Sequence, residues 1–153
     1  MFYKAILQTP IGKLGILTRN QFLTKIDFLM PESPLIEPQD EVLSTIATQL
    51  HYYFKYPNFK FTLPYQLQGT PFQISVWQAL SKITLQKNIS YGMLAKKLKT
   101  GARAIGNACR MNPLPILIPC HRVVAQKTVG GYKGEKIAIK KWLLTHEISC
   151  LKN

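Results

Sequence analysis

The chain has 153 residues, of which 46% are hydrophobic, so it has material for one ordinary core or two small ones. This composition excludes a disordered chain, and no apolar run approaches the roughly 18 residues of a membrane-spanning helix. The 20 Lys and Arg residues outnumber the 7 Asp and Glu residues, giving a formal net charge of +13. A surplus of this size predicts a polyanionic partner. A basic surface could also serve a membrane, but without an apolar run of spanning length we expect no membrane partner.

The positive charge is concentrated in the C-terminal half. Residues 1–80 carry six basic and five acidic residues, whereas the remainder carries fourteen basic residues against only Glu135 and Glu147. We therefore expect the C-terminal half to meet the partner. The first ten residues turn polar too early for a secretory leader, and three widely spaced cysteines do not suggest a disulfide framework. Both features favour a cytoplasmic location, in a reducing compartment.

The N-terminal part has the pattern of a small antiparallel sheet. Short runs of β-forming residues at 2–8, 14–18 and 22–29 are separated by turn-forming residues. Asp40 then precedes an apolar pattern of helical spacing that ends near Phe54, and this helix should cover one face of the sheet. The segment 56–69 lacks periodicity and ends in glycine. It marks a boundary between two lobes, at residues 1–65 and 69–150.

The C-terminal part predicts a series of helices. Thr70 and Pro71 begin the first, whose inner face contains Phe72, Val76, Ala79, Leu80 and Ile83. Helices follow from Ser90 to Leu98 and from Ala102 to Met111, joined by a short turn that contains glycine. This pair predicts either a helix-turn-helix or an ordinary αα-hairpin. After a strand at 122–125, a last helix runs from Glu135 to Glu147, with an inner face of Ala138, Ile139, Trp142 and Leu143.

The run Ile118-Pro-Cys-His-Arg-Val-Val124 sets a thiol beside an imidazole in a turn that proline restricts. His121 and Arg122 supply positive charge, which favours the nucleophilic thiolate form of Cys120. Cys120 is therefore a candidate nucleophile, with His121 as its base through a water and Glu147 orienting the imidazole. Alternatively, Cys120 is a half-buried structural residue and Glu147 a solvated residue at a helix end.

Three other interpretations compete with a nucleophilic cysteine. A zinc site built from the cysteines and histidines is disfavoured because no C-x-x-C or H-x-x-x-H pair occurs. A thiol hydrolase is disfavoured because such enzymes draw cysteine and histidine from distant parts of the sequence. A non-catalytic helix-turn-helix DNA-binding protein with a structural or redox-sensing cysteine explains the charge and the helices. It does not explain why the cysteine turn, a glycine-rich loop at 129–134 and Glu147 occur together.

The phrase Asn112-Pro-Leu-Pro-Ile-Leu-Ile-Pro-Cys-His-Arg-Val-Val124 resembles the active-site signature of the O6-alkylguanine-DNA alkyltransferases. Further segments that resemble this family are Thr-Pro-Phe-Gln73, Ser-Tyr91, Ala-Arg-Ala-Ile-Gly106, Gly-Gly-Tyr132 and Trp-Leu-Leu-Thr-His-Glu147. The resemblance implies an α/β (α+β) fold: a small N-terminal antiparallel sheet lobe of ribonuclease H-like type with one covering helix, followed by a mostly helical, winged helix-turn-helix-like alkyltransferase domain.

The same resemblance implies DNA repair by direct reversal. The protein would flip O6-alkylguanine, and also O4-alkylthymine, out of double-stranded DNA and transfer the alkyl group irreversibly to Cys120, once per molecule. His121 would deprotonate Cys120 through water, and Glu147 would hold His121. No cofactor is implied. Some relatives carry a structural zinc, but residues 1–60 contain no cysteine and only His51, so no metal site is expected. We expect a monomer in solution.

Family roles carry over to further positions. The helix from Ala102 would enter the minor groove, where Ala102, Ala104 and Gly106 permit close approach, Arg103 fills the gap left by the flipped base, and Arg110 also binds DNA. Tyr91 would help rotate the nucleotide and hydrogen-bond the guanine, while Asn112 would brace the active-site turn. Tyr132 and the backbone of Val129, Gly130 and Gly131 would line the base pocket. The simpler roles are a phosphate contact for Arg103, packing for Tyr91 and turn formation for Asn112.

Overall fold

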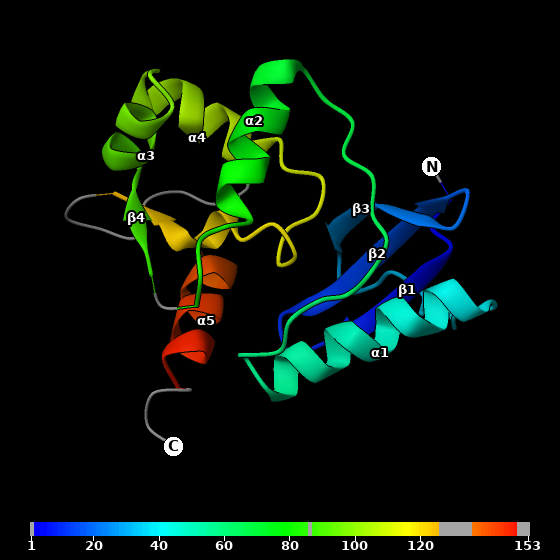
Figure 1. The fold of residues 1–153 in the computed structure, drawn as a ribbon. Helices are drawn as coiled ribbons and strands as arrows, with labels where there is room; N and C mark the ends of the chain where they lie inside the picture. Colours follow the sequence, from blue (N-terminus) through cyan, green and yellow to red (C-terminus); the bar gives the residue numbers. More distant parts are fainter. Residues whose placement is uncertain (1, 86, 126–135, 150–153) are drawn as a thin grey trace. The chain divides into compact units, whose positions relative to one another are not determined.

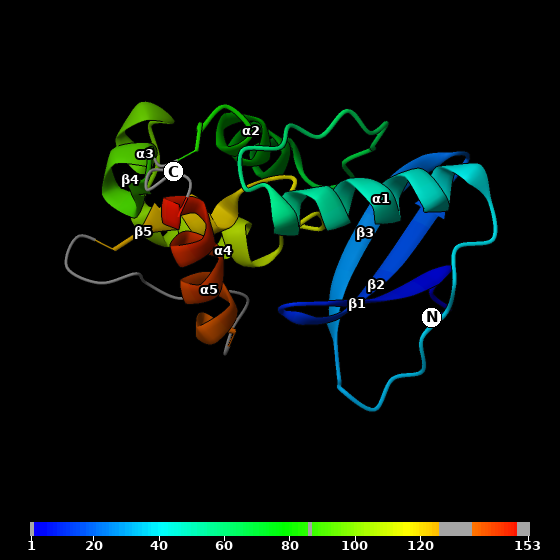
Figure 2. The same ribbon diagram turned by 90° about the horizontal axis from the view of Figure 1, so that it is seen from below.

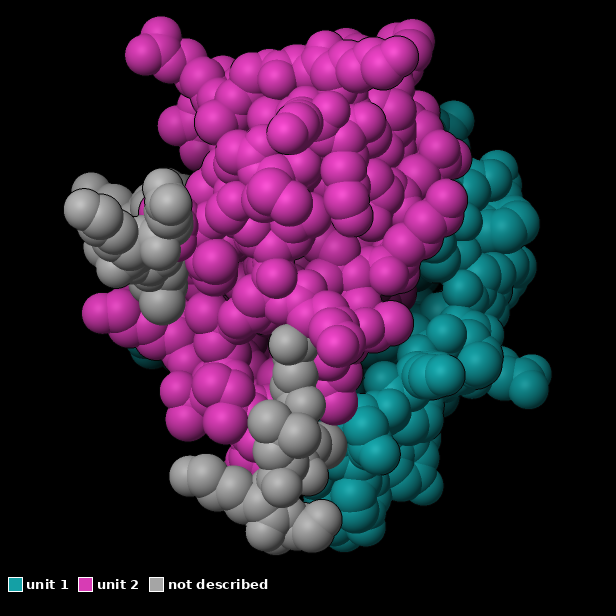
Figure 3. Space-filling view, turned by 60° about the vertical axis from the view of Figure 1, so that its left-hand side comes forward, with its two compact units in different colours: residues 1–68 teal, residues 69–153 magenta. Residues whose placement is uncertain are grey.

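A computed structural model describes residues 2–85, 87–125 and 136–149 of the chain, drawn in Figure 1 in colours that follow the sequence. The chain divides into two compact units, Met1–Gln68 and Gly69–Asn153 (Figure 3). Strands and helices occur in both, and the first unit holds a small antiparallel sheet. The predicted mixed α/β fold class is confirmed.

The first unit is a three-stranded antiparallel sheet with a helix on one face. Strands β1 (Ala5–Thr9), β2 (Gly12–Arg19) and β3 (Phe22–Leu29) pair in the order β1-β2-β3. Tight turns join them: Gly12 has a φ of 107°, and Asn20 and Gln21 have φ of 52° and 68°. Helix α1 (Glu41–Lys55) runs along the sheet in both ribbon views (Figures 1 and 2).

The core of this unit lies between α1 and the sheet. Asp40 caps the helix as predicted, since its Oδ1 accepts a hydrogen bond of 2.8 Å from the backbone N–H of Leu43. Four of the apolar residues expected at helical spacing are buried, namely Leu43, Ile46, Leu50 and Tyr53, whereas Val42 and Phe54 are half-buried. The core residues are Ala5, Ile6, Leu14, Ile16, Leu23, Ile26, Leu43, Ile46, Leu50, Tyr53 and Leu63.

The second unit begins with helix α2 (Pro71–Leu80). Its start is a capping box, in which the Thr70 hydroxyl accepts from the N–H of Gln73 and the Gln73 side chain accepts from the N–H of Thr70. Trp77 is fully buried, and its indole N–H donates to the carbonyl of Ala108 at 2.8 Å. The sequence placed Phe72 on the inner face, which is wrong: its side chain is 38% exposed at the first turn.

Helices α3 (Tyr91–Lys97) and α4 (Ala102–Arg110) pack against each other, as a helix-turn-helix requires. Ser90 caps α3 by accepting from the N–H of Met93. In the turn between the helices, Lys99 has a φ of 55°. The buried residues of α4 are Ile105, Ala108 and Cys109, while Ala102, Arg103 and Arg110 are exposed. The outer face of α4 therefore carries Ala102, Arg103 and Arg110, with Ala104 and Gly106 half-buried beside them.

A parallel two-stranded pair brings distant segments together, because β4 (Ile89–Ser90) pairs with β5 (Val123–Val124). The strand predicted at 122–125 is shorter than expected, since a 3₁₀ turn, η1 (Cys120–Arg122), precedes β5. Helix α5 (Ile137–Ile148) packs against η1. Its predicted start at Glu135 lies outside the described residues. Among the described residues, no helix has both the length and the hydropathy needed to cross a membrane.

The buried face of α5 differs from the predicted one. The buried residues are Lys140, Leu143, Leu144 and Glu147, whereas Ala138 is exposed and Trp142 is only half-buried. The spacing of i, i+3, i+4 and i+7 is that of one helix face. The prediction was right for Leu143 and wrong for Ala138, and it missed Lys140 and Glu147 because an apolar pattern cannot assign a lysine and a glutamate to the interior. These two charged side chains point to the chemistry of the second unit.

Candidate active site

The turn that carries Cys120 is buried and braced by Asn112. The Asn112 side chain is fully buried; its Nδ2 donates to the carbonyl of Ile118 at 2.8 Å, and its Oδ1 accepts from the N–H of Leu114 at 2.9 Å. Ile116, between these two contacts, has a φ of 80°, a conformation that is strained for a β-branched residue. Two side-chain hydrogen bonds thus hold a strained loop just before Cys120.

His121, Glu147 and Arg122 form a buried ionic array beside this turn. The Oε2 of Glu147 lies 2.6 Å from Nε2 of His121, and Arg122 donates to both carboxylate oxygens, from Nε to Oε1 at 2.9 Å and from Nη2 to Oε2 at 3.1 Å. Arg122 also donates from Nη1 to the carbonyl of Ile83. The positive charge predicted to act on the thiol therefore also anchors the glutamate, which sequence reasoning did not foresee.

The array sets the protonation of its members. Burial alone would raise the pKa of Glu147, but the hydrogen bonds and charges of His121 and Arg122 outweigh it and lower that pKa to about 2. Burial lowers the pKa of His121, against the opposing effect of Glu147. A neutral imidazole that donates from Nε2 to a carboxylate keeps the lone pair on Nδ1. That Nδ1 is buried and has no hydrogen-bond partner among the described residues.

Three further groups lie in the electrostatic neighbourhood of Cys120: Cys109, Tyr91 and Lys140. Cys120 and Cys109 are both buried and carry thiols that are not joined in a disulfide. Burial, and then the Cys120 charge, raises the pKa of the Cys109 thiol to about 12, so Cys109 is held as a thiol. Burial also raises the pKa of Tyr91 to about 12, again with contributions from Cys109 and Cys120. Tyr91 is therefore close to the candidate nucleophile in space, although 29 positions separate them in the chain.

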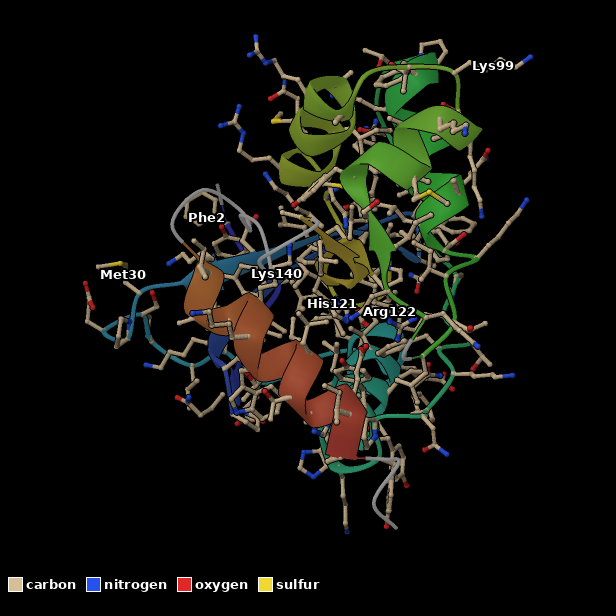
Figure 4. All side chains as sticks on the ribbon, turned by 90° about the vertical axis from the view of Figure 1, so that its left-hand side faces the viewer. Phe2, Met30, Lys99, His121, Arg122 and Lys140 are labelled. Carbon is tan, nitrogen blue, oxygen red and sulfur yellow. The ribbon has the colours of Figure 1, made fainter. Side chains whose placement is uncertain are left out.

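Lys140 is the residue of this site that sequence reasoning missed. Its side chain is fully buried, and its Nζ donates to the carbonyl of Val123 at 2.6 Å and to the hydroxyl of Tyr91 at 3.3 Å. Figure 4 shows Lys140, His121 and Arg122 gathered beside α5. The sequence pattern that could have identified Lys140 is its spacing of seven residues from Glu147, because residues seven apart lie on one face of a helix.

The residues predicted to meet DNA lie on the outer face of α4. Arg103 and Ala102 are exposed, Ala104 and Gly106 are half-buried, and Arg110 is exposed with its Nη2 3.4 Å from Oδ1 of Asn107. The glycine at 106 has no role in internal packing, because a Cβ added there would meet no atom within 4 Å. The absence of a side chain at Gly106 thus lowers the surface of α4 at this point and does not serve packing within the protein.

Part of the predicted site cannot be placed. The base-pocket residues Tyr132, Val129, Gly130 and Gly131, as well as Cys150, lie outside the described residues. Within the part of the chain that the structure describes, no three side chains of His, Cys, Asp or Glu are grouped as metal ligands would be. Cys109 and His121 are both buried near Cys120. The hydrogen-bond partner of the His121 ring is the carboxylate of Glu147 rather than a thiol.

Comparison with known proteins extends over both units. A family model described as "6-O-methylguanine DNA methyltransferase, DNA binding domain" matches residues 71–149, and one described as "6-O-methylguanine DNA methyltransferase, ribonuclease-like domain" matches residues 2–67. The constitutive methylated-DNA--protein-cysteine methyltransferase of Bacillus subtilis is 35% identical, over 96% of each chain. A probable methylated-DNA--protein-cysteine methyltransferase of Acanthamoeba polyphaga mimivirus is 37% identical, over 93% of this chain and 94% of the relative.

Solved structures agree with these sequences. The O6-methylguanine methyltransferase of Mycobacterium tuberculosis has a TM-score of 0.82 at 32% identity, covering 94% of this chain and 91% of that one. A structure of the OGT of the same organism in complex with DNA has a TM-score of 0.81 at 32% identity, covering 95% of this chain and 93% of that one. With matches of this identity across nearly its whole length, the chain belongs to the O6-methylguanine-DNA methyltransferase family.

Proposed function

We propose that Cys120 is the acceptor of this DNA-repair alkyltransferase, taking the alkyl group of O6-alkylguanine once per molecule. The observation that carries the proposal is the buried Nδ1 of His121, which has no hydrogen-bond partner within the described part of the chain. The imidazole of His121 is buried and neutral, and Glu147 holds it at Nε2. Its Nδ1 keeps a lone pair, and Cys120 is the preceding residue in the chain. A buried acceptor without a protein partner calls for water, and a water there would pass the proton of Cys120 to His121.

The reaction then needs only a thiolate and an alkylated base. A bond forms between Sγ of Cys120 and the alkyl carbon, the bond from that carbon to O6 breaks, and its electron pair stays on guanine. The proton that left the thiol ends on guanine, so the reaction is balanced without a cofactor. The product is a thioether, which water does not cleave. One molecule of protein therefore repairs one lesion.

The Glu147–Arg122 pair supports this role for His121. A carboxylate beside an imidazole fixes its tautomer and stabilises the imidazolium that forms when the thiol proton arrives. Because Arg122 binds both oxygens of Glu147, the carboxylate cannot swing away. Asn112 serves the same purpose for the backbone, since its two hydrogen bonds hold the turn before Cys120.

Double-stranded DNA is the partner that α4 fits. We place this helix in the minor groove, because its exposed face combines Arg103 and Arg110 with small residues at Ala102, Ala104 and Gly106. The open space around Gly106 supports close approach by a partner, since no internal packing requires a glycine there. The DNA complex of the Mycobacterium tuberculosis OGT supports a DNA partner for this fold.

The buried position of Cys120 supports base flipping. Its thiol is only 2% exposed, so a base stacked within a duplex could not reach it. In this scheme Arg103 occupies the gap in the duplex, Tyr91 hydrogen-bonds the extruded guanine, and Tyr132 with Val129, Gly130 and Gly131 encloses it. O4-alkylthymine is a second substrate of the same chemistry. We expect the protein to act as a monomer in the cytoplasm, where a reducing environment preserves the thiol.

The test is a covalent one. The protein is incubated with a duplex that contains one O6-methylguanine, and in parallel with the same duplex unmodified. Intact mass should show one added methyl group only with the lesion, and peptide mapping should place it on Cys120. A DNA-binding protein whose cysteine is only structural would bind both duplexes and gain no mass, which would refute the proposal. A methyl group on Cys109 would refute the assignment of Cys120.

A further inference from the structure

The positive charge of the second unit is not confined to α4. Fourteen basic residues follow residue 80, and only Arg103 and Arg110 of these belong to α4. Residues 42–134 include no aspartate or glutamate, so no carboxylate within this long stretch of sequence neutralises the surplus. DNA binding by α4 therefore accounts for only a small part of the charge.

Three exposed lysines line one hollow of about 690 Å³, which we call the lysine hollow. They are Lys82, Lys87 and Lys97. The hollow lies between the end of α2, residues 82–84 and 87–90, and α3, where the chain leaves α2 and returns through β4 (Figure 1). Like charges around one hollow repel each other, so binding of a polyanion would relieve this repulsion.

The walls of the lysine hollow are held in place by the segment that follows Cys120. The carbonyl of Ile83, just after α2, accepts a hydrogen bond from Nη1 of Arg122. On another wall, Ile89 and Ser90 of β4 pair with β5, which directly follows Arg122. A site whose walls are already held loses little conformational freedom when it binds a partner. The lysine hollow is therefore a preformed surface.

The side chains of the lysine hollow have the chemistry that a sugar-phosphate backbone needs. Half of its described lining residues carry side-chain hydrogen-bond donors, namely Lys82, Thr84, Lys87, Asn88, Ser90 and Lys97. Lysine, threonine, asparagine and serine are side chains that commonly contact phosphate oxygens. The floor between them is apolar and consists of less exposed residues, including Ile83, Ile89 and Leu94. A deoxyribose can pack against such a floor while its phosphates meet the donors.

Two other kinds of occupant fit the lysine hollow less well. Protein interfaces are anchored by aromatic residues and arginine, and the described lining residues include neither. A small anionic ligand is usually enclosed by its site, whereas all three lysines, Thr84 and Asn88 are exposed. The hollow also lies wholly within residues 71–149, which match the DNA-binding domain of the family. The occupant that these observations favour is DNA.

The lysine hollow is separate from the face that α4 presents. None of its described lining residues belongs to α4 or to residues 99–101 before it. Helix α4 packs against α3, which forms one wall of the hollow, and the arginines of α4 are exposed on its outer face. The arginines of α4 and the lysines of the hollow therefore form two distinct basic surfaces.

We propose that the lysine hollow binds the sugar-phosphate backbone of a second segment of double-stranded DNA while α4 holds the first. The inference goes beyond the proposed function and shares with it only the binding of DNA by α4. The contact is electrostatic and independent of sequence, because every sequence presents the same phosphates. A protein with two such surfaces can pass between neighbouring DNA segments without release into solution, which shortens the search for a lesion.

The test asks whether one protein molecule can hold two duplexes. An unmodified duplex is fixed to beads and loaded with the protein, and a fluorescent duplex of unrelated sequence is then added in solution. The beads should retain the fluorescent duplex only when they carry the protein. Sedimentation velocity in excess duplex should show a complex of one protein molecule with two duplexes. A complex of one protein with only one duplex would overturn the inference.

The variant that tests the surface is the triple substitution Lys82→Gln, Lys87→Gln and Lys97→Gln. Because all three side chains are exposed, its thermal unfolding should match that of the wild type. Capture of the fluorescent duplex should fall about tenfold or more, because each lysine on a phosphate releases a counterion. The slope of log affinity for this duplex against log salt concentration should lose about one per lysine. Undiminished capture or an unchanged slope would overturn the inference.

The matched control removes the same charge from the first unit, by Lys4→Gln, Lys55→Gln and Lys60→Gln at three exposed positions. It should change capture by less than about twofold, because these lysines lie outside both basic surfaces. An equal loss in the two triple variants would mean that only net charge matters, and it would overturn the inference. Should the triple variant of the hollow unfold, its three single variants replace it, each with a loss of about twofold to threefold.

Two further outcomes would count against the lysine hollow as a second DNA site. If it contacts the same duplex as α4, its triple variant will weaken binding of the first duplex and no complex with two duplexes will form. If it serves an acidic protein, the triple variant will capture DNA as the wild type does. Failure of the proposed function is seen separately, because the wild type would then gain no methyl group from a lesion, whereas both duplexes used here are unmodified.

Discussion

The interiors of the two units differ in kind. Every buried side chain in residues 2–68 that forms the core is hydrophobic, from Ala5 to Leu63. In the second unit the described interior also holds Asn112, His121, Lys140 and Glu147. Burying polar and charged groups costs free energy unless each is paired, and such groups concentrate at functional sites. The apolar interior of the first unit is what a stable fold requires. The buried polar and charged groups of the second unit cost folding free energy, and we explain their presence by the proposed active site.

The largest expected effect tests whether the chemistry depends on one atom. Cys120→Ala should abolish methyl transfer completely and leave duplex binding within about twofold of wild type, because α4 does not include this residue. Cys109→Ala is the matched control, since it also removes a buried free thiol. It should retain transfer. Mass spectrometry and gel-shift measurements check both variants, and any transfer by Cys120→Ala would place the chemistry elsewhere.

Next in size is the loss of the buried carboxylate. Glu147→Gln leaves Arg122 without an anionic partner, and breaking a buried ion pair costs about 3 to 5 kcal/mol of unfolding free energy. Transfer should slow by about a hundredfold or more because the tautomer of His121 is no longer fixed. Urea unfolding and single-turnover kinetics at neutral pH measure the two losses. Unchanged kinetics with reduced stability would make the array structural, as in an ordinary core.

The same variant has a predicted pH dependence. The pKa of Glu147 in the folded protein is lowered from 4.5 to about 2, so the paired carboxylate stabilises the fold fully above pH 4.5. This contribution is lost as the pH falls toward about 2. The difference in unfolding free energy between wild type and Glu147→Gln should therefore narrow across that window. A difference that stays constant would contradict an ionised Glu147.

A smaller effect tests whether the positive charge of α4 acts at a specific place on DNA or only adds to the net charge of the protein. Arg103→Ala and Lys60→Ala remove the same charge from exposed positions, one on α4 and one in the first unit. Arg103→Ala should slow repair in duplex DNA by about tenfold or more, since extruding a base costs a few kcal/mol that Arg103 would offset in the proposed scheme. Reaction with the free base O6-methylguanine should change less than about twofold. Equal slowing of both substrates, or an equal effect of Lys60→Ala, would contradict the role of Arg103.

The smallest effect concerns the surface of α4. Gly106→Ala should stabilise the fold by about 1 kcal/mol through helix propensity, because the added methyl meets nothing inside the protein. It should nevertheless weaken duplex binding, by about tenfold, if a groove wall approaches this face closely. Gly92→Ala, also an open helical position, should give a similar gain in stability without the loss in binding. Equal affinities of the two variants would argue against close contact at Gly106.

Much of this fold could be predicted because its signals are local. Asp40, Thr70 and Ser90 each cap a helix as expected, since a side-chain oxygen at that position satisfies a free backbone N–H. The pair of β4 with β5 could not be predicted. Each strand has two residues, which is too short for any periodicity, and their pairing depends on segments more than thirty positions apart.

The site could be predicted in part for the same reason. Cys120 and His121 are adjacent in the sequence, and Glu147 stands out as one of only two acidic residues after residue 80. Lys140 could not be found because lysine normally lies on the surface, and only the fold reveals that its face of α5 is buried. Phe72 and Ala138 were misplaced for the opposite reason, since apolar residues are often exposed near helix starts and pattern alone does not exclude it.

Gly69, at the boundary of the two units, limits how the protein can be cut or recombined. A Cβ at this position would lie 2.7 Å from the ring of Trp77, whose N–H holds the backbone of α4 at Ala108. A side chain introduced here would therefore disturb Trp77 and, through its hydrogen bond to Ala108, the position of α4 nearly forty residues further along the chain. Chimaeras that exchange the two units between relatives should have their junction before Gly69, so that this glycine and Trp77 come from the same parent protein.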